Sequence, residues 1–138
     1  MGNAKIFSTL DLTRGFWQIP LKENAKQYCA FRTCRGLMEW SVMPFGLINS
    51  TATFTKMMRK ILPSNKNILH YVDDISIFSN DWQSHLIPLE EVFKTLKQNK
   101  LTVTPSKVKI GLNEIEFLGH KFSNGHIEPT DQFNNKIL

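Results

Sequence analysis

The sequence predicts an α+β domain in which an antiparallel sheet has the split βαβ, or ferredoxin-like, topology with helices on one face. Three observations predict this fold class. Strand-like and helix-like segments follow the order strand, helix, strand, strand, helix, strand. The two central strands flank an adjacent acidic pair, Asp73 and Asp74, as the strands of a β-hairpin flank their turn. A second hairpin is inserted after the first strand.

The composition limits the class of protein. The chain has 138 residues, of which 41% are hydrophobic, so it is one domain, or a fragment of one, that can bury a core. Its formal net charge of +5 favours anionic partners such as nucleic acid. Two cysteines, Cys29 and Cys34, do not make a secreted disulfide framework, and no apolar run approaches the length of a membrane span. We therefore expect an intracellular protein with no membrane partner.

The first strand is predicted at residues 5–11, where consecutive side chains alternate between two faces. It ends in a turn signal, Asp-Leu-Thr-Arg-Gly, at residues 11–15. Residues 28–33 and 37–42 predict the inserted hairpin, which turns at Cys-Arg-Gly. Residues 43–46, Met-Pro-Phe-Gly, predict a loop because proline and glycine both interrupt regular structure.

Two amphipathic helices are predicted, at residues 51–62 and 81–98. Asn49 or Ser50 can cap the start of the first helix, and Pro63 stops it. The apolar side chains of this helix recur at i, i+3, i+4, i+7 and i+8, and they are Phe54, Met57, Met58, Ile61 and Leu62. Such spacing places them on one face, which is expected to pack against the sheet.

Pro88 lies inside the second predicted helix and has no backbone N–H to donate, so we expect a kink or a later helix start there. After this helix, residues 101–104 and 107–110 are weak strand candidates separated by a proline. Residues 115–122 predict a stronger strand, which is followed by Asn-Gly as a hairpin turn. Residues 129–131, Pro-Thr-Asp, predict a helix start.

The central hairpin is predicted at residues 68–79, with Asp73 and Asp74 at its tip, where both carboxylates stay solvated. Within a strand one of them would face the core, and burying an unpaired carboxylate is costly. Aspartate is also a common turn residue, so the pair alone is consistent with an ordinary turn. The predicted topology places the first strand beside this hairpin. Asp11, at the end of that strand, can therefore meet Asp73 and Asp74.

Three carboxylates brought together repel one another and raise one another's pKa unless a cation joins them. Hard oxygen ligands select Mg²⁺ or Mn²⁺, and no cysteine or histidine of the sequence is spaced like a zinc site. Two such ions about 3.5–4 Å apart can clamp the attacking and leaving oxygens of an in-line phosphoryl transfer. On the carboxylates alone, a polymerase and a two-metal nuclease are both possible.

The chain resembles reverse transcriptases, in particular those of gypsy-type LTR retrotransposons, over nearly its whole length. Four stretches carry the resemblance. Tyr-Val-Asp-Asp at 71–74 is similar to the Tyr-x-Asp-Asp box, and residues 7–12 with 15–20 are similar to the first catalytic motif. Residues 39–40 with 43–47 and 52–54 are similar to the second catalytic motif, and Phe-Leu-Gly-His at 117–120 is similar to the primer-grip strand. Each motif is weak alone, but the four in this order and spacing are specific.

The resemblance implies an RNA-directed DNA polymerase palm across residues 1–138, with 21–43 as a fingers-like insertion and 113–138 as a primer-grip hairpin leading toward a thumb. The implied cofactors are two Mg²⁺ or Mn²⁺ ions. The implied partners are an RNA or DNA template with its primer, dNTPs, and the rest of a Pol polyprotein with fingers, thumb and RNase H. The implied location is intracellular: cytoplasmic, including a virus-like particle, or nuclear.

The resemblance also implies roles for individual residues. The catalytic residues are Asp11, Asp73 and Asp74, and the main-chain carbonyl of Leu12 joins them as a metal ligand. Phe16 matches the aromatic gate that fills the space of a ribose 2′-OH. Lys107 lies near a lysine that aids pyrophosphate departure, although a plain surface lysine is the alternative. The implied nucleotide-binding residues are Arg14, Gly15, Phe16, Phe45, Gly46 and Lys107, and the implied primer grip is Phe117, Leu118, Gly119 and His120.

The sequence departs from the family pattern at a few positions. Thr51 stands where the family usually has proline. Ile48 stands where the family often has lysine, and the loss of that lysine would weaken nucleotide binding. The basic fingers segment that would precede the first motif, the thumb and RNase H are outside the sequence. The alternative function is therefore a catalytically inactive retroelement remnant, or truncated chain, with only weak nucleic-acid binding.

Overall fold

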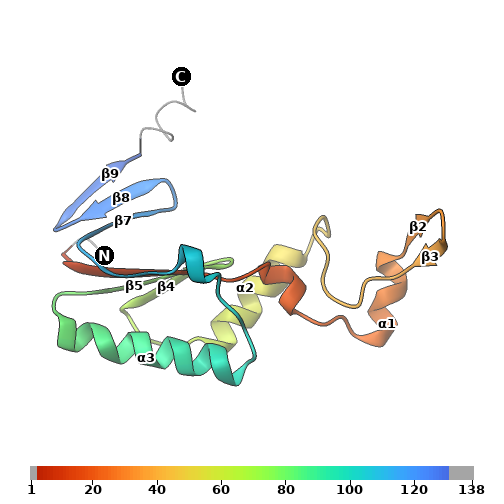
Figure 1. Cartoon of the computed structure of the whole chain (residues 1–138), viewed down its shortest axis with the longest axis horizontal. Coiled ribbons are helices and arrows are strands. Elements are labelled where there is room, and N and C mark those ends of the chain that lie inside the picture. The colour runs from red at the N-terminus through yellow and green to blue at the C-terminus, as the bar shows by residue number, and fades with distance from the viewer. Residues whose placement is uncertain (1–2, 131–138) are drawn as a thin grey trace.

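The structure, a computed structural model, describes residues 3–130 and consists of a body and an arm that extends from it (Figure 1). The body contains a four-stranded sheet formed by β1 (Ile6–Asp11), β4 (Ile68–Tyr71), β5 (Asp74–Ser79) and β6 (Lys109–Leu112), in the order β4-β5-β1-β6. All neighbouring strands are antiparallel. This order confirms the predicted split βαβ topology, because the central hairpin lies beside the first strand.

Two long helices cover one face of this sheet (Figure 1). α2 (Ser50–Ile61) and α3 (Trp82–Gln98) each begin and end within one residue of the prediction. The side chain of Asp81 caps α3, since its Oδ1 accepts the backbone N–H of Ser84 at 2.9 Å. The Asn49 side chain makes no capping hydrogen bond at α2.

Pro88 lies within α3, which rules out the later helix start and leaves the kink as a prediction. Proline cannot donate to the carbonyl of Ser84, which would leave that oxygen without its helical partner. The Ser79 hydroxyl, at the end of β5, donates to this carbonyl at 3.4 Å. Pro88 itself is fully buried, so it contributes to packing between the helix and the sheet.

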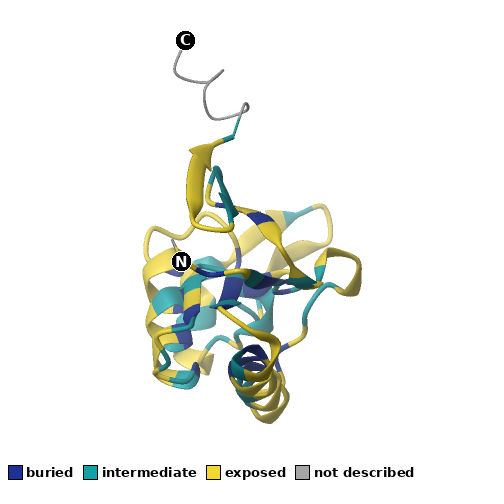
Figure 2. Cartoon of the chain, turned by 90° about the vertical axis from the view of Figure 1, so that its left-hand side faces the viewer, coloured by how far each residue is buried: buried dark blue, intermediate teal, exposed yellow. Residues whose placement is uncertain are grey.

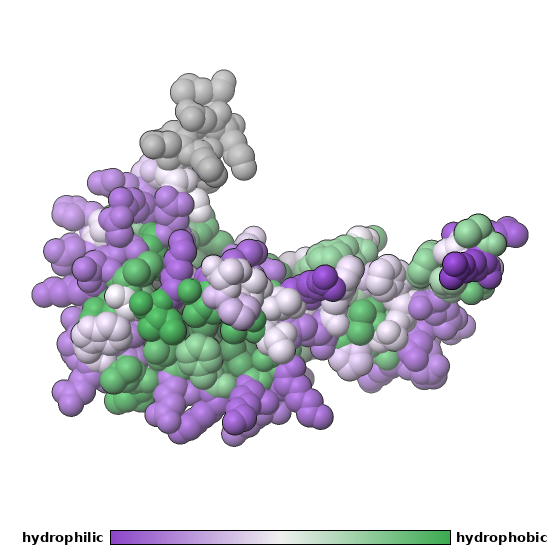
Figure 3. All heavy atoms as spheres, in the orientation of Figure 1, coloured by the Kyte–Doolittle hydropathy of each residue, from purple (hydrophilic) through white to green (hydrophobic). Residues whose placement is uncertain are grey.

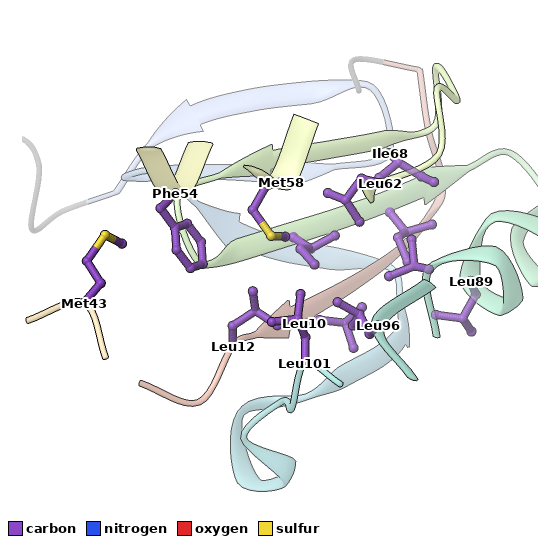
Figure 4. Close-up of a cluster of buried hydrophobic side chains, with 13 residues drawn as sticks. Leu10, Leu12, Met43, Phe54, Met58, Leu62, Ile68, Leu89, Leu96 and Leu101 are labelled. Atoms are coloured by element: carbon purple, nitrogen blue, oxygen red, sulfur yellow. The ribbon is translucent and has the colours of Figure 1, made fainter. Parts of the chain in front are cut away.

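The main hydrophobic core lies between the sheet and the two helices, and Figure 4 shows its side chains converging from both layers. Phe54 and Met58 of α2 and Ile75 and Ile77 of β5 have no measurable exposure. Each such side chain contributes about 1.5–3 kcal/mol through burial. The members are Leu10, Leu12, Met43, Phe54, Met58, Leu62, Ile68, Ile75, Ile77, Leu89, Val92, Leu96 and Leu101. Buried residues concentrate in this layer, whereas the outer surfaces are exposed (Figure 2).

A three-stranded antiparallel sheet follows, formed by β7 (Glu114–Phe117), β8 (His120–Ser123) and β9 (His126–Pro129). The single strand predicted at 115–122 is wrong, because the chain turns back at Leu118 and Gly119. Both residues have positive φ, 52° and 77°, as a tight two-residue hairpin turn requires. The second turn, at Asn-Gly, is confirmed. The predicted helix start falls on Pro129, which ends β9, and on Thr130, which belongs to no helix or strand, while Asp131 lies outside the described residues.

The segment between α3 and the three-stranded sheet is less regular than predicted. Residues 101–104 form no strand, and only Val103 makes an isolated bridge, to Leu12. The other strand candidate, residues 107–110, begins inside a 3-10 turn, Pro105–Lys107. The strand that forms in this region is β6, which begins at Lys109. Within the part of the chain that the structure describes, no helix is long and apolar enough to cross a membrane.

The arm (residues 21–43) carries a short helix, α1 (Glu23–Lys26), and the hairpin of β2 (Phe31–Thr33) and β3 (Gly36–Met38). The inserted hairpin is confirmed, although its strands are shorter than predicted and α1 was not predicted. No arm residue except Met43 is buried. The arm projects away from the body (Figure 3). On the face of the molecule drawn there, apolar residues gather on the body.

Candidate active site: an acidic corner

Three aspartates from distant parts of the sequence meet at one end of the main sheet. In the antiparallel pairing of β1 with β5, Asp11 lies directly opposite Asp74. The backbone N–H of Leu12 donates to the carbonyl oxygen of Asp73 at 3.0 Å, which extends the pairing into the turn. We call Asp11, Asp73 and Asp74 the acidic corner. The predicted split βαβ topology anticipated this meeting, because it placed the first strand beside the central hairpin.

The hairpin turn differs by one residue from the prediction. Tyr71 pairs with Asp74, so the two residues at the tip are Val72 and Asp73, while Asp74 begins β5. Val72 has a φ of 53°, a conformation that is rare for a β-branched residue and costs about 1–3 kcal/mol. The strained turn fixes where strand pairing stops and therefore where Asp73 leaves the sheet.

The faces of the sheet show where the acids point. Leu10 and Ile75, the register pair next to Asp11 and Asp74, lie in the core beneath the helices. Since successive side chains of a strand alternate, Asp11 and Asp74 point to the opposite face. That is the face on which the three-stranded sheet packs, through a second small core that includes Phe7.

Both carboxylate oxygens of Asp11 have partners. The Thr104 hydroxyl donates to Oδ1 at 3.0 Å, and the Lys107 ammonium lies 3.0 Å from Oδ2. The backbone N–H of Thr104 also donates to the carbonyl oxygen of Asp11 at 2.8 Å. Lys107, which lies at the surface, is therefore an ion-pair partner of Asp11. Thr104 was missed in the sequence, because no local pattern shows that its segment returns to the end of the first strand.

Electrostatic interactions in the corner shift two pKa values. Burial raises the pKa of Asp74 above its ordinary value, and the negative charges of Asp73 and Asp11 raise it further. The hydrogen bond to Asp11 and the charge of that carboxylate raise the pKa of Lys107. The corner therefore has an excess of negative charge that one ammonium group offsets only in part.

The corner has the donor chemistry of a divalent metal site. Its oxygens are the ligands that Mg²⁺ and Mn²⁺ prefer. Burial and then repulsion by Asp73 and Asp11 raise the pKa of Asp74, and a bound cation would relieve the repulsion. In residues 3–130, no three His, Cys, Asp or Glu side chains form a ready-made cage for a metal ion. The residues fit such ions in chemical type, and Lys107 is the group that a cation would replace at Oδ2 of Asp11.

The turn after β1 packs directly against the corner. Gly15 is buried, and a Cβ added to it would lie 3.0 Å from Cβ of Asp73 and 3.1 Å from Cζ of Phe54. A larger residue would require the turn or these neighbours to shift by a few tenths of an ångström. Arg14, with a φ of 49°, precedes it and places its guanidinium 5.2 Å from the ring centre of Trp17. Trp17 belongs with Gly15 to a 3-10 turn.

Phe16 links the core to the loop that follows the arm. Its ring makes edge-to-face contacts with Phe54, at 5.3 Å between centroids, and with Phe45, at 5.4 Å. Phe45 is 61% exposed, and Gly46 beside it has a φ of 88°. The structure thus brings together Phe16 and Phe45, two of the residues predicted to bind nucleotide, on one side of the acidic corner.

The predicted primer-grip residues lie on the other side. A groove of about 320 Å³ runs between the corner and the β7–β8 hairpin, and its lining includes Asp11, Asp74, Lys107, Phe117 and Leu118. Gly119 shapes the turn of this hairpin, and its carbonyl oxygen accepts the backbone N–H of Thr130 at 2.9 Å. In His120, the first residue of β8, Nδ1 lies 3.1 Å from the carbonyl oxygen of Leu118.

Comparisons with known proteins give a consistent result. Residues 1–122 match the family described as reverse transcriptase (RNA-dependent DNA polymerase). The chain is 41% identical over 120 residues to Polyprotein P3 of Commelina yellow mottle virus, and 41% identical over 122 residues to the retrovirus-related Pol polyprotein from transposon opus of Drosophila melanogaster. These alignments cover 86% and 87% of the chain but only 6% and 12% of the two relatives.

Solved structures agree with the sequence relatives. The foamy viral protease-reverse transcriptase in complex with an RNA/DNA hybrid superposes with a TM-score of 0.88 at 32% identity, over 98% of this chain and 18% of that one. The same protein in complex with dsDNA gives a TM-score of 0.86 at 33% identity, over 96% and 28% of the two chains. The fold of the body is therefore of the polymerase palm type.

Proposed function

Since this chain belongs to the reverse transcriptase (RNA-dependent DNA polymerase) family, we propose that it is the palm, with part of the fingers, of an enzyme that extends a primer with deoxynucleotides. The observation that carries the proposal is the register of β1 and β5, which sets Asp11 opposite Asp74 and beside Asp73. Carboxylates held by a rigid sheet suit a reaction in which positioning and charge neutralisation supply most of the catalysis.

In this proposal Asp11, Asp73 and Asp74 are catalytic. Asp11 and Asp73, with the main-chain carbonyl of Leu12, would hold two Mg²⁺ or Mn²⁺ ions, and Asp74 would support them. When bound, such ions activate the attacking hydroxyl and neutralise charge on the leaving pyrophosphate. Lys107 lies close enough to the corner to leave Asp11 and bind an anionic product.

The two sides of the corner would take different parts of the substrate. Phe16, supported by Phe54 and Phe45, would lie under the sugar of the incoming nucleotide and exclude a 2′-OH. Backbone N–H groups of the turn at Arg14 and Gly15 would bind phosphate oxygens, as turn amides do.

The groove beside the β7–β8 hairpin would take the primer end. This assignment is supported by the groove itself, because residues of the acidic corner and of the β7–β8 hairpin both line it. Phe117, Leu118, Gly119 and His120 would then be the primer grip. The partners are accordingly a primed RNA or DNA template, dNTPs and the remaining parts of a Pol polyprotein.

We also propose that the chain comes from a gypsy-type LTR retrotransposon. The Pol polyproteins of the Drosophila melanogaster transposons opus and 297 are 41% and 39% identical to it. Plant viral polyproteins match at similar identity, so the order of domains encoded around this segment would test the assignment. Integrase sequence downstream of RNase H would support a retrotransposon, and its absence would favour a viral origin.

The replacement Asp73→Asn tests the polymerase assignment. In the longest natural polypeptide that carries this segment, we expect Mg²⁺-dependent primer extension to fall about a thousandfold or more, because several kcal/mol of transition-state stabilisation are lost. Binding of the primed template should persist. Asp81→Asn is the matched control, since asparagine also caps helices and Asp81 lies at the start of α3.

Unchanged extension by Asp73→Asn would overturn the assignment. The inactive alternative would be favoured if the unmodified chain bound primed template without extending it. In that case binding should be weak, and its affinity should fall steeply as salt is added. Hydrolysis of labelled nucleic acid without added dNTPs would instead favour a nuclease.

A further inference from the structure

Thr104 contacts the acidic corner through both its backbone and its side chain. Its N–H donates to the carbonyl oxygen of Asp11 at 2.8 Å, and its hydroxyl donates to Oδ1 of the same residue at 3.0 Å. The hydroxyl also lies 3.1 Å from that of Thr13. Both threonines are half-buried.

The directions of these hydrogen bonds follow from the chemistry of the partners. The ionised carboxylate of Asp11, which is paired with Lys107, can only accept. The Thr104 hydroxyl therefore gives its one proton to Asp11, and Thr13 must donate to the oxygen of Thr104. This one-way chain runs from the turn after β1, through the segment after α3, to a carboxylate oxygen of the corner.

The Thr104 hydroxyl is not needed to hold its own segment in place. Gln18 already clamps that segment to the turn, since its side-chain amide donates to the carbonyl oxygens of Thr13 and Thr102 at 2.6 and 3.0 Å. The backbone N–H of Thr102 donates in return to Gln18 Oε1 at 2.7 Å. The backbone N–H of Thr13 also donates to the Thr102 carbonyl oxygen at 3.0 Å. The hydroxyl of Thr104 is therefore free to give its proton to the carboxylate while it accepts one from Thr13.

The two partners of Asp11 differ in how firmly they hold it. Thr104 is β-branched, half-buried and stiff at its one side-chain torsion. Lys107 reaches Oδ2 by a long, flexible side chain that is 63% exposed. Thr104 can therefore keep Oδ1 in place while Lys107 leaves Oδ2.

We propose that Thr104 is a positioning residue that sets the orientation of the Asp11 carboxylate and so presents Oδ2 to a divalent cation. The proposal deepens the polymerase assignment and rests on it. Residues that hold metal ligands by hydrogen bonds typically change metal affinity or activity 10–100-fold when they are replaced. Thr104 would act through the Asp11 carboxylate and not as a metal ligand itself.

The test measures cation binding directly, on the 138-residue chain. Mn²⁺ binding is followed by electron paramagnetic resonance in the unmodified chain, Thr104→Val, Thr104→Ser and Asp11→Asn. Valine keeps the shape of threonine without the hydroxyl, and serine keeps the hydroxyl. We expect the Mn²⁺ dissociation constant to rise about tenfold in Thr104→Val and to stay within about twofold of normal in Thr104→Ser. Asp11→Asn should abolish binding.

Thr95→Val is the control, because Thr95 is a half-buried threonine of α3 outside this hydrogen-bond chain. Thermal melting checks that each variant folds, and Thr104→Ala replaces the valine variant if that one does not. In the longer polypeptide, Thr104→Val should lower kcat and raise the Mg²⁺ concentration for half-maximal extension. KM for the primed template should be unchanged.

Normal Mn²⁺ affinity in a folded Thr104→Val or Thr104→Ala variant would overturn the proposal. So would failure of Thr104→Ser to restore binding, or the absence of Mn²⁺ binding by the unmodified chain. Primer extension by the unmodified polypeptide reports separately on the polymerase assignment. Extension that persists while Thr104→Val binds Mn²⁺ normally would therefore refute only the role of Thr104.

Discussion

The body and the arm are held by different interactions. In the body, strand register and a core of fully buried side chains fix each residue of the acidic corner. In the arm, no residue except Met43 is buried, and the contacts include the ring pair of Phe31 with Trp40, whose centroids are 5.5 Å apart. The geometry of the acidic corner therefore depends on packing in the body, whereas the arm has no comparable core to hold its shape.

The largest difference is expected between Phe54→Ala in the body and Phe31→Ala in the arm. Phe54 has no exposed surface and supports Phe16, so its replacement should lower the free energy of unfolding by about 3–5 kcal/mol. Phe31 is 39% exposed, and its loss should cost less than about 1 kcal/mol. Urea unfolding curves of the two variants measure both values. Equal losses would mean that the arm is as firmly packed as the body.

Glycines in the two regions give a smaller and more specific contrast. Gly15→Ala should cost about 1–3 kcal/mol through overpacking, because its Cβ would press on Asp73 at 3.0 Å. It should also reduce primer extension by displacing that carboxylate.

Gly36→Ala in the arm is the matched variant. It has a φ of 114° and open space around it, so it should cost about 1 kcal/mol of local strain with extension unchanged. Stability by urea unfolding and extension by the longer polypeptide separate the two effects. An equal loss of extension in both variants would show that the arm, too, positions the acids.

The sequence was a better guide to the body than to contacts made by irregular segments. Periodic apolar residues and the hairpin at the aspartates limit the topology to a few possibilities, and the topology alone places Asp11 beside Asp74. The turn at Leu118 and Gly119 was missed because the first of its two residues is not a usual turn former. Helix α1 was missed because four residues are too few for a helical pattern.

The hydrogen bond from Thr104 to Asp11 is the feature of the site that was least predictable from the sequence. It joins two segments that are distant along the chain, and one of them has no periodic structure. Nothing in the neighbourhood of Thr104 indicates burial or a partner. Local patterns predict strands and helices, whereas side-chain contacts across irregular segments depend on the whole fold.

The smallest expected effect concerns the charge of the corner. Because the pKa of Asp74 is raised in the folded chain, that chain binds more protons than the unfolded one between the ordinary value of 3.8 and the raised value. The free energy of unfolding therefore falls as pH rises through this interval, and the penalty is complete above it. Asp74→Asn should stabilise the chain at pH 7 by less than about 1 kcal/mol, since the site is partly exposed and screened.

This gain should shrink as the pH is lowered toward 3.8, which urea unfolding at several pH values would reveal. The matched arm variant is Glu23→Gln, which breaks an exposed ion pair with Lys26 and should change stability little at any of these pH values. A destabilised Asp74→Asn at pH 7 would mean that the carboxylate has a structural partner. A stabilised one would show that the body retains repelling acids at the expense of its own stability, as expected where charge serves a function.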